Sequence, residues 1–405
     1  MFEADCPACG DKFIERIYDF GLIPPVNTFP AHGEDCSSSM VPLVLNVCTS
    51  CWLLHLSKPP KLELMFENYH YRSGSIEGNV QHLCSVSEFL GSRFDGSKKI
   101  LEVGCNDGTL LKFLNKKFNK CVGIDPAKNL DPQAQCDVFT GFFDMESAKV
   151  LSDMHGLFDV VVGLNVFAHN IDCVGMMHAS ESILQKEGVL VIEVAYAPKT
   201  ILKGNYDTIY HEHVYSFSLT SLQKTMQISG LRVIDIEMLE TQGGSVRVLA
   251  CKADADFPIN ERVGQVLAEE KKMGINNIEL YRSLSSTIEQ KITAISAFID
   301  RMNQAKKRVL LAGAPARGVV LLNTARSRFE PGVVAADDTP EKQGRLMPGL
   351  NIPVLAWPEI TADDFDVAFV LSWNYEKKMI RDLRDIGFVG SVYVPFPSLK
   401  NLYQL

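Results

Sequence analysis

Apolar and polar positions follow different periods along the chain, and the changes divide it into three parts. Residues 1–60 contain Cys and Pro and show little helical periodicity. Between residues 98 and 252, apolar runs of strand length alternate with amphipathic stretches, which is the pattern of a parallel α/β sheet. A second α/β pattern begins at Arg308. The sequence therefore predicts an α/β protein with a short N-terminal module and two sheet-containing lobes.

Apolar runs predict the individual strands of the central lobe. These strands are expected at Lys99–Val103, Cys121–Ile124, Phe158–Leu164, Val189–Val194, Arg232–Glu237 and Ser245–Cys251. No helical stretch separates the last two, so they are expected to form an antiparallel pair at the edge of the sheet.

Helical patterns flank this lobe on both sides. Residues 61–95 predict two helices around a Tyr-rich loop. Residues 260–306 predict one long helical stretch, because they contain no Pro and only Gly264 and Gly274 interrupt them. The C-terminal lobe is then expected to contain strands at Val309–Ala312, Val333–Asp337 and Val367–Leu371 and a helix at Gly318–Ala325.

The two α/β lobes resemble each other at their beginnings. Each has an apolar strand, a Gly-containing turn, a helix and a second strand that ends in Asp. The first reads ILEVGCNDGTLL…CVGIDP and the second reads VLLAGAPARGVVLL…GVVAADDTP. This weak internal repetition is what two similar nucleotide-binding folds in tandem would produce.

Composition narrows the class of protein. The 46% of hydrophobic residues are typical of a globular chain, and no apolar run approaches the roughly 18 residues of a membrane span. The net charge of −9 argues against a nucleic-acid-binding protein, although a local basic groove is compatible with it. The odd count of 11 cysteines, with no secretory signal at the N-terminus, favours reduced thiols and a cytoplasmic location.

Four cysteines form two CxxC pairs near the N-terminus. Cys6 and Cys9 make the first pair, and Cys48 and Cys51 make the second. Four thiolates suit a closed, tetrahedral structural zinc site, although the spacer is longer than the roughly 15–20 residues of zinc ribbons. The alternative is four buried cysteines without metal. Cys36 is a weaker candidate ligand because it has no paired cysteine.

The segment Ile100–Thr109 has the composition of a cofactor-binding turn between a strand and a helix. It lacks the GxGxxG pattern that seats a pyrophosphate. Instead, Gly104, Asn106 and Gly108 are followed by Asp125 at the end of the next strand, where a carboxylate can bind ribose hydroxyls. S-adenosylmethionine (SAM) has a ribose and no phosphate, so it fits this pattern. A plain strand–helix turn without a ligand is the alternative.

Two polar and aromatic segments are candidates for catalysis. Tyr210–Phe217 reads YHEHVYSF and follows the Gly204–Asn205 turn. Its His spacing differs from that of metal-binding HExxH helices, so acid–base catalysis is the main interpretation, with a structural loop or a metal site as alternatives. Residues 67–74 read ENYHYRSG, which indicates either a lid that brings Tyr71 to a pocket or a helix-capping loop.

In combination, these features resemble the sugar C-methyltransferases of deoxysugar biosynthesis. The resemblance covers nearly the whole chain and rests on the order of its motifs. They are CPACG…PPVNTFP…PLVLNVCTSCWLLHL, LEVGCNDGTLL, GIDPAKNL, NVFAHN, YHEHVYSFS, KQGRLMPGLNIPV and LSWNY. The resemblance implies a zinc-binding domain (1–65), a Rossmann-like SAM domain (66–255) and a second Rossmann-like domain that positions the sugar nucleotide (256–405).

The resemblance also implies roles for individual residues. The catalytic positions would be Tyr71, His169, Tyr210, Glu212 and His213, with Tyr69 as the competing match for Tyr71. The cofactor-binding positions would be Glu102, Gly104, Asn106, Gly108, Asp125 and Asn165. The substrate-binding positions would be Arg317, Asp337 and Asp338. The family carries a Lys in the C-terminal Gly-rich turn, whereas Arg317 presents a wider, forked cation here.

The expected reaction follows from the chemistry of methyl transfer to carbon. A sugar carbon becomes nucleophilic only when a neighbouring ketone allows an enolate to form. The substrate is therefore expected to be a nucleotide-linked 4-keto sugar methylated at C-3, carried by TDP or alternatively by GDP or CDP. His213 is expected to remove the proton, and Tyr210, assisted by His169, to stabilise the enolate. The alternatives are small-molecule O-methylation, RNA methylation and non-catalytic binding of a sugar nucleotide.

Overall fold

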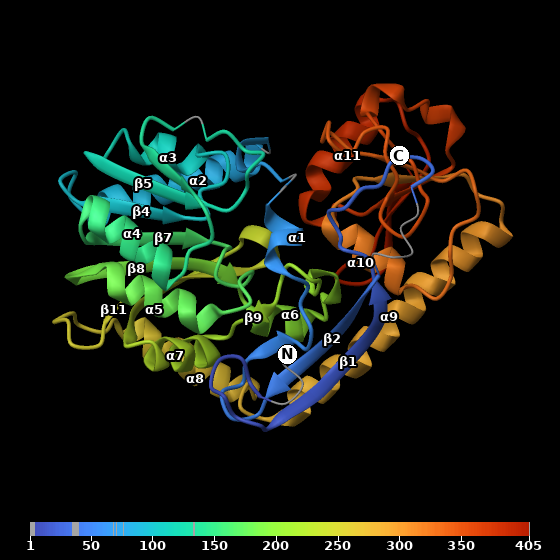
Figure 1. Ribbon diagram of the computed structural model, residues 1–405. Helices are drawn as coiled ribbons and strands as arrows, with labels where there is room; N and C mark the ends of the chain where they lie inside the picture. The colour runs from blue at the N-terminus through green and yellow to red at the C-terminus, as the bar shows by residue number, and fades with distance from the viewer. Residues whose placement is uncertain are drawn as a thin grey trace. The chain divides into compact units, whose positions relative to one another are not determined.

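β-Sheets organise every part of the chain that the structure describes (Figure 1). The computed structural model describes residues 5–34, 40–67, 69, 71–75, 77–132 and 134–404. The first sheet has the strand order β1-β2-β3-β9. Its strands are β1 (Ile14–Ile23), β2 (Val41–Cys48), β3 (Leu54–Leu56) and β9 (Tyr215–Ser216).

The second sheet has seven strands in the order β10-β11-β8-β7-β4-β5-β6. They are β4 (Lys99–Val103), β5 (Lys120–Asp125), β6 (Asp137–Thr140), β7 (Phe158–Leu164), β8 (Leu184–Ala195), β10 (Leu231–Leu239) and β11 (Ser245–Lys252). β11 pairs antiparallel with both β10 and β8, and the other pairs are parallel. The expected antiparallel pair at the sheet edge is therefore confirmed.

Helices cover both faces of this sheet (Figure 1). The apolar core on one face includes α2 (Glu77–Arg93) and α3 (Thr109–Leu114). The core on the other face includes α4 (Met145–His155), α5 (Cys173–Ile183) and α7 (Leu219–Ile228). A strand that is buried on both faces needs apolar side chains at successive positions, and Val160, Val161 and Val162 are fully buried.

The expected helical stretch over residues 260–306 is broken into two helices. α8 (Glu261–Met273) ends at Gly274, whose φ of 87° is left-handed, and α9 (Ile278–Gln304) follows. The prediction of one continuous stretch was wrong at this point. Glycine adopts left-handed backbone without the steric penalty of a Cβ atom and is therefore the usual residue at a helix end.

The third sheet has the strand order β14-β13-β12-β15-β16-β17. Its strands are β12 (Val309–Ala312), β13 (Val334–Ala336), β14 (Val354–Leu355), β15 (Val367–Val370), β16 (Ser391–Val394) and β17 (Lys400–Gln404). β17 pairs antiparallel with β16, and the other pairs are parallel. Helices α10 (Ala316–Thr324) and α11 (Glu376–Asp385) belong to this part of the chain, which agrees with the expected second Rossmann-like lobe.

Contacts between residues divide the chain into two compact units. Unit 1 comprises Met1–Glu15, Asn46–Lys199 and Val214–Ile278, and unit 2 comprises Arg16–Leu45, Thr200–His213 and Glu279–Leu405. These boundaries differ from the three consecutive domains expected from the sequence, which remain a prediction. Within the described residues, no helix combines the length and the apolar character that crossing a membrane requires.

Candidate active site

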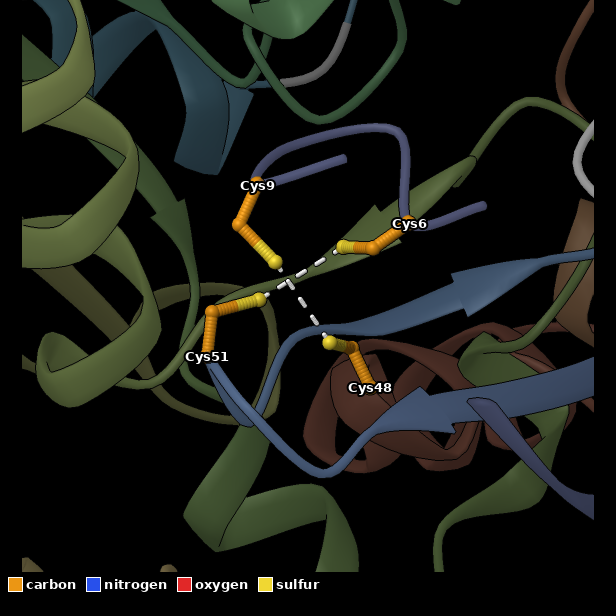
Figure 2. Close-up of side chains that lie close together, drawn as sticks. All are labelled: Cys6, Cys9, Cys48 and Cys51. Atoms are coloured by element: carbon orange, nitrogen blue, oxygen red, sulfur yellow. Dashed lines mark hydrogen bonds between the residues drawn. The ribbon is translucent and has the colours of Figure 1, made fainter. Parts of the chain in front are cut away.

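The four cysteines of the two CxxC pairs converge in unit 1 (Figure 2). The Sγ atoms of Cys6 and Cys51 lie 3.6 Å apart, as do those of Cys9 and Cys48, and all four lie within 4.8 Å of one another. Zn–S bonds of about 2.3 Å in a tetrahedron place sulfur atoms about 3.8 Å apart. The four thiolates therefore fit a closed zinc site with no position for a substrate. Cys36 lies outside the described residues.

Both cysteine pairs sit on turns of the same kind. The amide of Gly10 donates to the carbonyl of Cys6, and the amide of Trp52 donates to the carbonyl of Cys48. Gly10 and Trp52, each following the second cysteine of its pair, both have left-handed backbone. Trp52 is strained in this conformation, which is consistent with a backbone held by four ligands to one ion.

The predicted cofactor residues after β4 and β5 come together in unit 1. The Asp125 carboxylate accepts a hydrogen bond from the amide of Asn106 at 2.8 Å and another from the amide of Ala127 at 2.9 Å. Gly104 and Gly108 have φ values of 72° and 74°. These bonds shape a tight turn at the carboxyl ends of parallel strands, where ligands of α/β sheets bind.

Close packing explains the glycine at the start of this turn. A Cβ atom on Gly104 would lie 2.3 Å from a methyl carbon of Val166, which follows β7. Asn165, directly after β7, has a φ of 56°, and Asn106 has a φ of 51°. Left-handed backbone at residues with a side chain is costly and is concentrated at functional sites. Two such residues at neighbouring strand ends support a ligand site there.

Glu102 places a buried carboxyl group beneath this turn. Its side chain is 5% exposed, and its Oε2 atom has no hydrogen-bond partner among the described residues. Burial, followed by the charges of Asp125 and Asp107, raises the pKa of Glu102 well above its ordinary value. SAM would bring positively charged sulfonium and ammonium groups, which would offset the repulsion among these carboxyl groups and favour the ionised form of Glu102.

The segment that contains Tyr71 is tied to the cofactor turn. The Asn106 side chain accepts a hydrogen bond from the amide of Ser73 at 2.8 Å and donates one to the carbonyl of Tyr71 at 3.0 Å. The Asp107 carboxylate accepts from the amide of Gly74 at 2.8 Å. The Asn106 side chain thus holds this segment, and the bonds support a segment anchored at the cofactor site rather than a simple helix cap.

His169 belongs to an aromatic cluster in the same unit. Its ring is stacked on Phe66, with centroids 5.9 Å apart, and the rings of Tyr69 and Tyr71 continue the cluster. Burial lowers the pKa of His169 to about 4. The imidazole is therefore neutral near pH 7, and Tyr69 and Tyr71 are both part of its aromatic surroundings.

The other predicted catalytic residues lie in unit 2. The rings of Tyr210 and His213 face each other, with centroids 4.0 Å apart. The Nδ1 atom of His213 lies 2.7 Å from the carbonyl oxygen of Thr208. A carbonyl only accepts hydrogen bonds, so Nδ1 carries the proton and Nε2 of the neutral ring carries the lone pair. This hydrogen bond fixes the orientation of the His213 ring.

The two remaining residues of the YHEH motif have different surroundings. His211 is 1% exposed, its Nε2 atom lies 3.3 Å from the Val41 carbonyl, and burial lowers its pKa to about 4. Glu212 is buried and accepts a hydrogen bond of 2.6 Å from the Asn27 side chain. His211 thus has a structural environment, whereas Glu212 is held by a residue from the N-terminal part of the chain.

The C-terminal lobe repeats the geometry of the cofactor turn. The Asp337 carboxylate accepts from the amides of Ala314 at 2.8 Å and Thr339 at 3.0 Å. Gly313 has a φ of 88°, and a Cβ atom on it would lie 2.1 Å from Oγ of Ser372, directly after the β15 region. The internal repetition in the sequence thus corresponds to two turns of the same construction.

The three predicted substrate residues near the C-terminal turn differ in burial and in their charged neighbours. Burial by itself raises the pKa of Asp337, but Lys342 and the amides of Ala314 and Thr339 outweigh this effect and lower it. Asp338 is exposed and pairs with Lys378. Arg317 is 8% exposed and lies over the ring of Trp373, 5.4 Å from its centroid. Arg317 and Asp337 are therefore better placed than Asp338 at this turn.

Sequence reasoning missed three residues that contact these groups. Asn27 bonds Glu212, and the Trp373 indole donates to Asp207 at 2.6 Å. Asn27 and Trp373 lie in segments quoted for the resemblance, PPVNTFP and LSWNY, and Asp207 lies three positions before Tyr210. No local pattern links them, because each bond joins residues more than 160 positions apart.

Family models match the chain in three consecutive parts. Residues 6–66 match "Putative zinc binding domain", residues 76–236 match "Methyltransferase domain", and residues 240–397 match "C-methyltransferase C-terminal domain". With the zinc ligands and the cofactor turn, the fold defines a SAM-dependent methyltransferase. The C-terminal match narrows this class to the SAM-dependent C-methyltransferases.

A relative and two solved structures are similar to the chain. C-methyltransferase NovU of Streptomyces niveus is 28% identical over 402 residues, which are 97% of this chain and 96% of the relative. Magnesium protoporphyrin IX methyltransferase of Synechocystis PCC 6803 is 18% identical, with a TM-score of 0.35 over 43% of this chain and 84% of that chain. A SAM-dependent methyltransferase of Archaeoglobus fulgidus is 15% identical, with a TM-score of 0.37 over 43% and 94%. Structural likeness at this level carries no conclusion about function.

Proposed function

We propose that this C-methyltransferase acts at C-3 of a nucleotide-linked 4-keto-deoxysugar. The observation that carries the proposal is the composition of unit 2. The candidate base, His213, and the candidate substrate cation, Arg317, belong to the same compact unit, whereas the cofactor turn belongs to unit 1. Unit 2 thus combines acid–base groups with a second turn of the type that binds nucleotides. A sugar nucleotide with an acidic carbon requires both: the turn for its nucleotide and the acid–base groups for its acidic C–H bond.

Proton removal from C-3 is assigned to His213. The Thr208 carbonyl fixes the proton on Nδ1 and leaves the lone pair on Nε2. The electrons of the C-3–H bond move into the enolate of the 4-ketone, and Nε2 accepts the proton. When bound at the turn that contains Gly104, Asn106 and Gly108, SAM would supply an electrophilic methyl group for the C-3 carbanion.

The enolate oxygen needs a hydrogen-bond donor where its charge develops. Tyr210 is assigned this role because its ring faces His213 at 4.0 Å between centroids. His169, neutral because burial lowers its pKa to about 4, assists as a second donor. Glu212 is assigned to a sugar hydroxyl or to the orientation of the base, and Tyr71 keeps the substrate-contacting role that the family resemblance implies.

The nucleotide is assigned to the turn after β12. Arg317 offers a forked guanidinium at the start of α10, which suits the diphosphate. Asp337 shapes the turn through Ala314 and Thr339. TDP is the expected carrier, with GDP and CDP as alternatives, and no nucleic acid or membrane takes part. The cytoplasmic location remains a prediction.

Product analysis tests the proposal. Purified protein is incubated with SAM and a panel of 4-keto-6-deoxy sugar nucleotides, and the products are examined by mass spectrometry and carbon NMR. A mass gain of one methylene with the new methyl on C-3 supports the proposal. A methyl group on oxygen would instead support the small-molecule O-methyltransferase, and methylation of none of these sugars would refute the substrate class.

A further inference from the structure

Asp207 is a fully buried carboxylate that the proposed reaction does not use. It lies in the 3₁₀ helix η3 (Tyr206–Thr208), three positions before Tyr210. Its Oδ2 atom accepts a hydrogen bond of 2.6 Å from the indole of Trp373. Its Oδ1 atom has no hydrogen-bond partner among the described residues. A buried carboxylate is costly unless charge partners compensate it.

The compensating charges come from the nucleotide turn and from α9. Burial raises the pKa of Asp207, and the positive charge of Arg317, the indole hydrogen bond and the charge of Lys291 oppose this rise in that order. Lys291 also donates to the carbonyl of Lys203 at 2.6 Å. Arg317 lies over the same Trp373 ring that bonds Asp207. Carboxylate, guanidinium and indole therefore form one cluster.

The next residue of the same 3₁₀ helix contacts the candidate base. The Thr208 carbonyl accepts the Nδ1 hydrogen of His213 at 2.7 Å. The Asp207 side chain thus faces the nucleotide turn, while the adjacent carbonyl sets the tautomer and direction of His213. One short helix connects the two parts of unit 2 that the reaction needs.

We propose that Asp207 is a positioning residue that holds Arg317 and Trp373 for the nucleoside diphosphate and keeps η3 in place beneath His213. This inference rests on the proposed function, because it assigns the diphosphate to Arg317. Asp207 holds the indole over which the Arg317 guanidinium lies, so a diphosphate meets a cation that is already in place. Binding energy from the nucleotide, remote from C-3, is then available for orienting the reacting carbon at the base.

Two variants separate this role from a general contribution to folding. Asp207→Asn keeps the shape of the side chain and removes its charge, and Trp373→Phe keeps a ring near Arg317 but removes the indole donor. Asp363→Asn, an exposed carboxylate of the same unit, is the matched control. For each protein, calorimetry measures binding of TDP and of SAM, and NMR in D₂O measures exchange of the C-3 hydrogen of a 4-keto sugar nucleotide with S-adenosylhomocysteine present.

Asp207→Asn should weaken TDP binding about tenfold and slow C-3 exchange by up to about 10²-fold, since small misplacements of reacting groups have effects of this size. SAM affinity should stay at the wild-type value. Trp373→Phe should produce part of the same loss, and the double variant should lose less than the product of the two single losses, because both changes act on the same contact between Asp207 and Trp373. The control should match the wild type.

Wild-type TDP affinity and exchange in Asp207→Asn would overturn the inference, whatever the melting temperature. Losses that multiply in the double variant would overturn it as well. If Asp207→Asn does not fold, Trp373→Phe decides alone, and unchanged TDP binding in that variant contradicts the proposal. A wild-type protein that binds none of TDP, GDP and CDP would instead refute the proposed function itself.

Discussion

Glu102 is the residue at which cofactor binding and stability should oppose each other. Its pKa in the folded, unliganded protein lies well above the ordinary value because of burial and the neighbouring carboxylates. The folded state therefore binds a proton that the unfolded state has lost, and stability falls as the pH rises above the ordinary pKa towards the raised one. A glutamine at this position does not titrate, so it makes no pH-dependent contribution to stability.

Glu102→Gln should accordingly make the unliganded protein more resistant to unfolding at high pH and weaken SAM binding. Hydrogen bonds to charged groups contribute about 1.5–3 kcal/mol, so the dissociation constant for SAM should rise about tenfold or more. Thermal unfolding between about pH 5 and pH 9 and calorimetry with SAM measure the two effects. Unchanged SAM affinity would show that Glu102 does not face the cofactor.

His213→Asn should abolish exchange of the C-3 hydrogen for deuterium, because an amide cannot accept the proton. The measurement uses a keto-sugar nucleotide in D₂O with S-adenosylhomocysteine in place of SAM. His178→Asn, at an exposed position of α5, is the matched control and should exchange normally. A His213→Asn protein that still methylates at nearly the wild-type rate would remove His213 as the base and leave His169 as the leading candidate.

Tyr210→Phe should slow the same exchange without abolishing it. Removing one donor to a developing oxyanion typically lowers the rate about 10²–10³-fold, and Glu212→Gln should have an intermediate effect. Binding of the sugar nucleotide should be retained in both variants. If both lose binding and fold together, the YHEH segment has a structural role only.

At the scale of elements, the Asp125 carboxylate connects the turn between β4 and α3 to the end of β5. Asp125→Ala removes the acceptor for the amides of Asn106 and Ala127 as well as the ribose contact expected of Asp125. We expect weaker SAM binding with the chain still folded, measured by calorimetry and circular dichroism. Wild-type affinity in this variant would mean that the cofactor binds elsewhere.

Elements buried on both faces were the easiest to predict from the sequence. The strands Lys99–Val103, Phe158–Leu164 and Val309–Ala312 have the predicted bounds, because continuous apolar runs between turns have few other interpretations. Gly274 was recognised as an interruption, but the sequence did not distinguish it as a helix end from Gly264, which lies within α8. β1 was missed because the predictive pattern for exposed strands is weaker. β2 is mostly buried, but it contains Pro42, which weakens a strand pattern.

The candidate site was predictable only where chemistry is local in sequence. CxxC pairs and the Gly104–Gly108 turn could be recognised because all their members are near neighbours. Asn27 and Asp207 could not, because their partners are distant and a single Asn or Asp is common in loops. Asp338 was chosen by adjacency to Asp337, and the structure distinguishes the two: Asp337 is buried and accepts backbone amides, whereas Asp338 is exposed and pairs with Lys378.

At the scale of the whole molecule, bound zinc should stabilise the seven-stranded sheet as well as the N-terminal segment. Cys6, Cys48 and Cys51 belong to the same apolar core as Leu101 and Val161 of the seven-stranded sheet. Removing zinc with a chelator should therefore lower the melting temperature of the holoprotein. In a domain of this size, each kcal/mol of lost stability corresponds to about 2–4 °C. SAM affinity should change only at higher chelator concentrations than the melting temperature.

The matched comparison for zinc uses two serine variants. Cys51→Ser should reproduce the effect of the chelator, whereas Cys84→Ser, at a half-buried cysteine outside the cluster, should not. Elemental analysis should find one zinc per chain in freshly purified protein. Its absence there would contradict the assignment.

The interleaved make-up of unit 2 limits how such an enzyme can be altered by recombination. Arg16–Leu45, Thr200–His213 and Glu279–Leu405 build it jointly, and the bonds from Asn27 to Glu212 and from Trp373 to Asp207 connect these stretches. A chimaera that received only Glu279–Leu405 from a relative would combine the relative's nucleotide turn with the Asn27 and Asp207 segments of this protein. On the proposed function, a new sugar preference is inherited only when all three stretches are exchanged together, whereas the methyl-donor half can be retained unchanged.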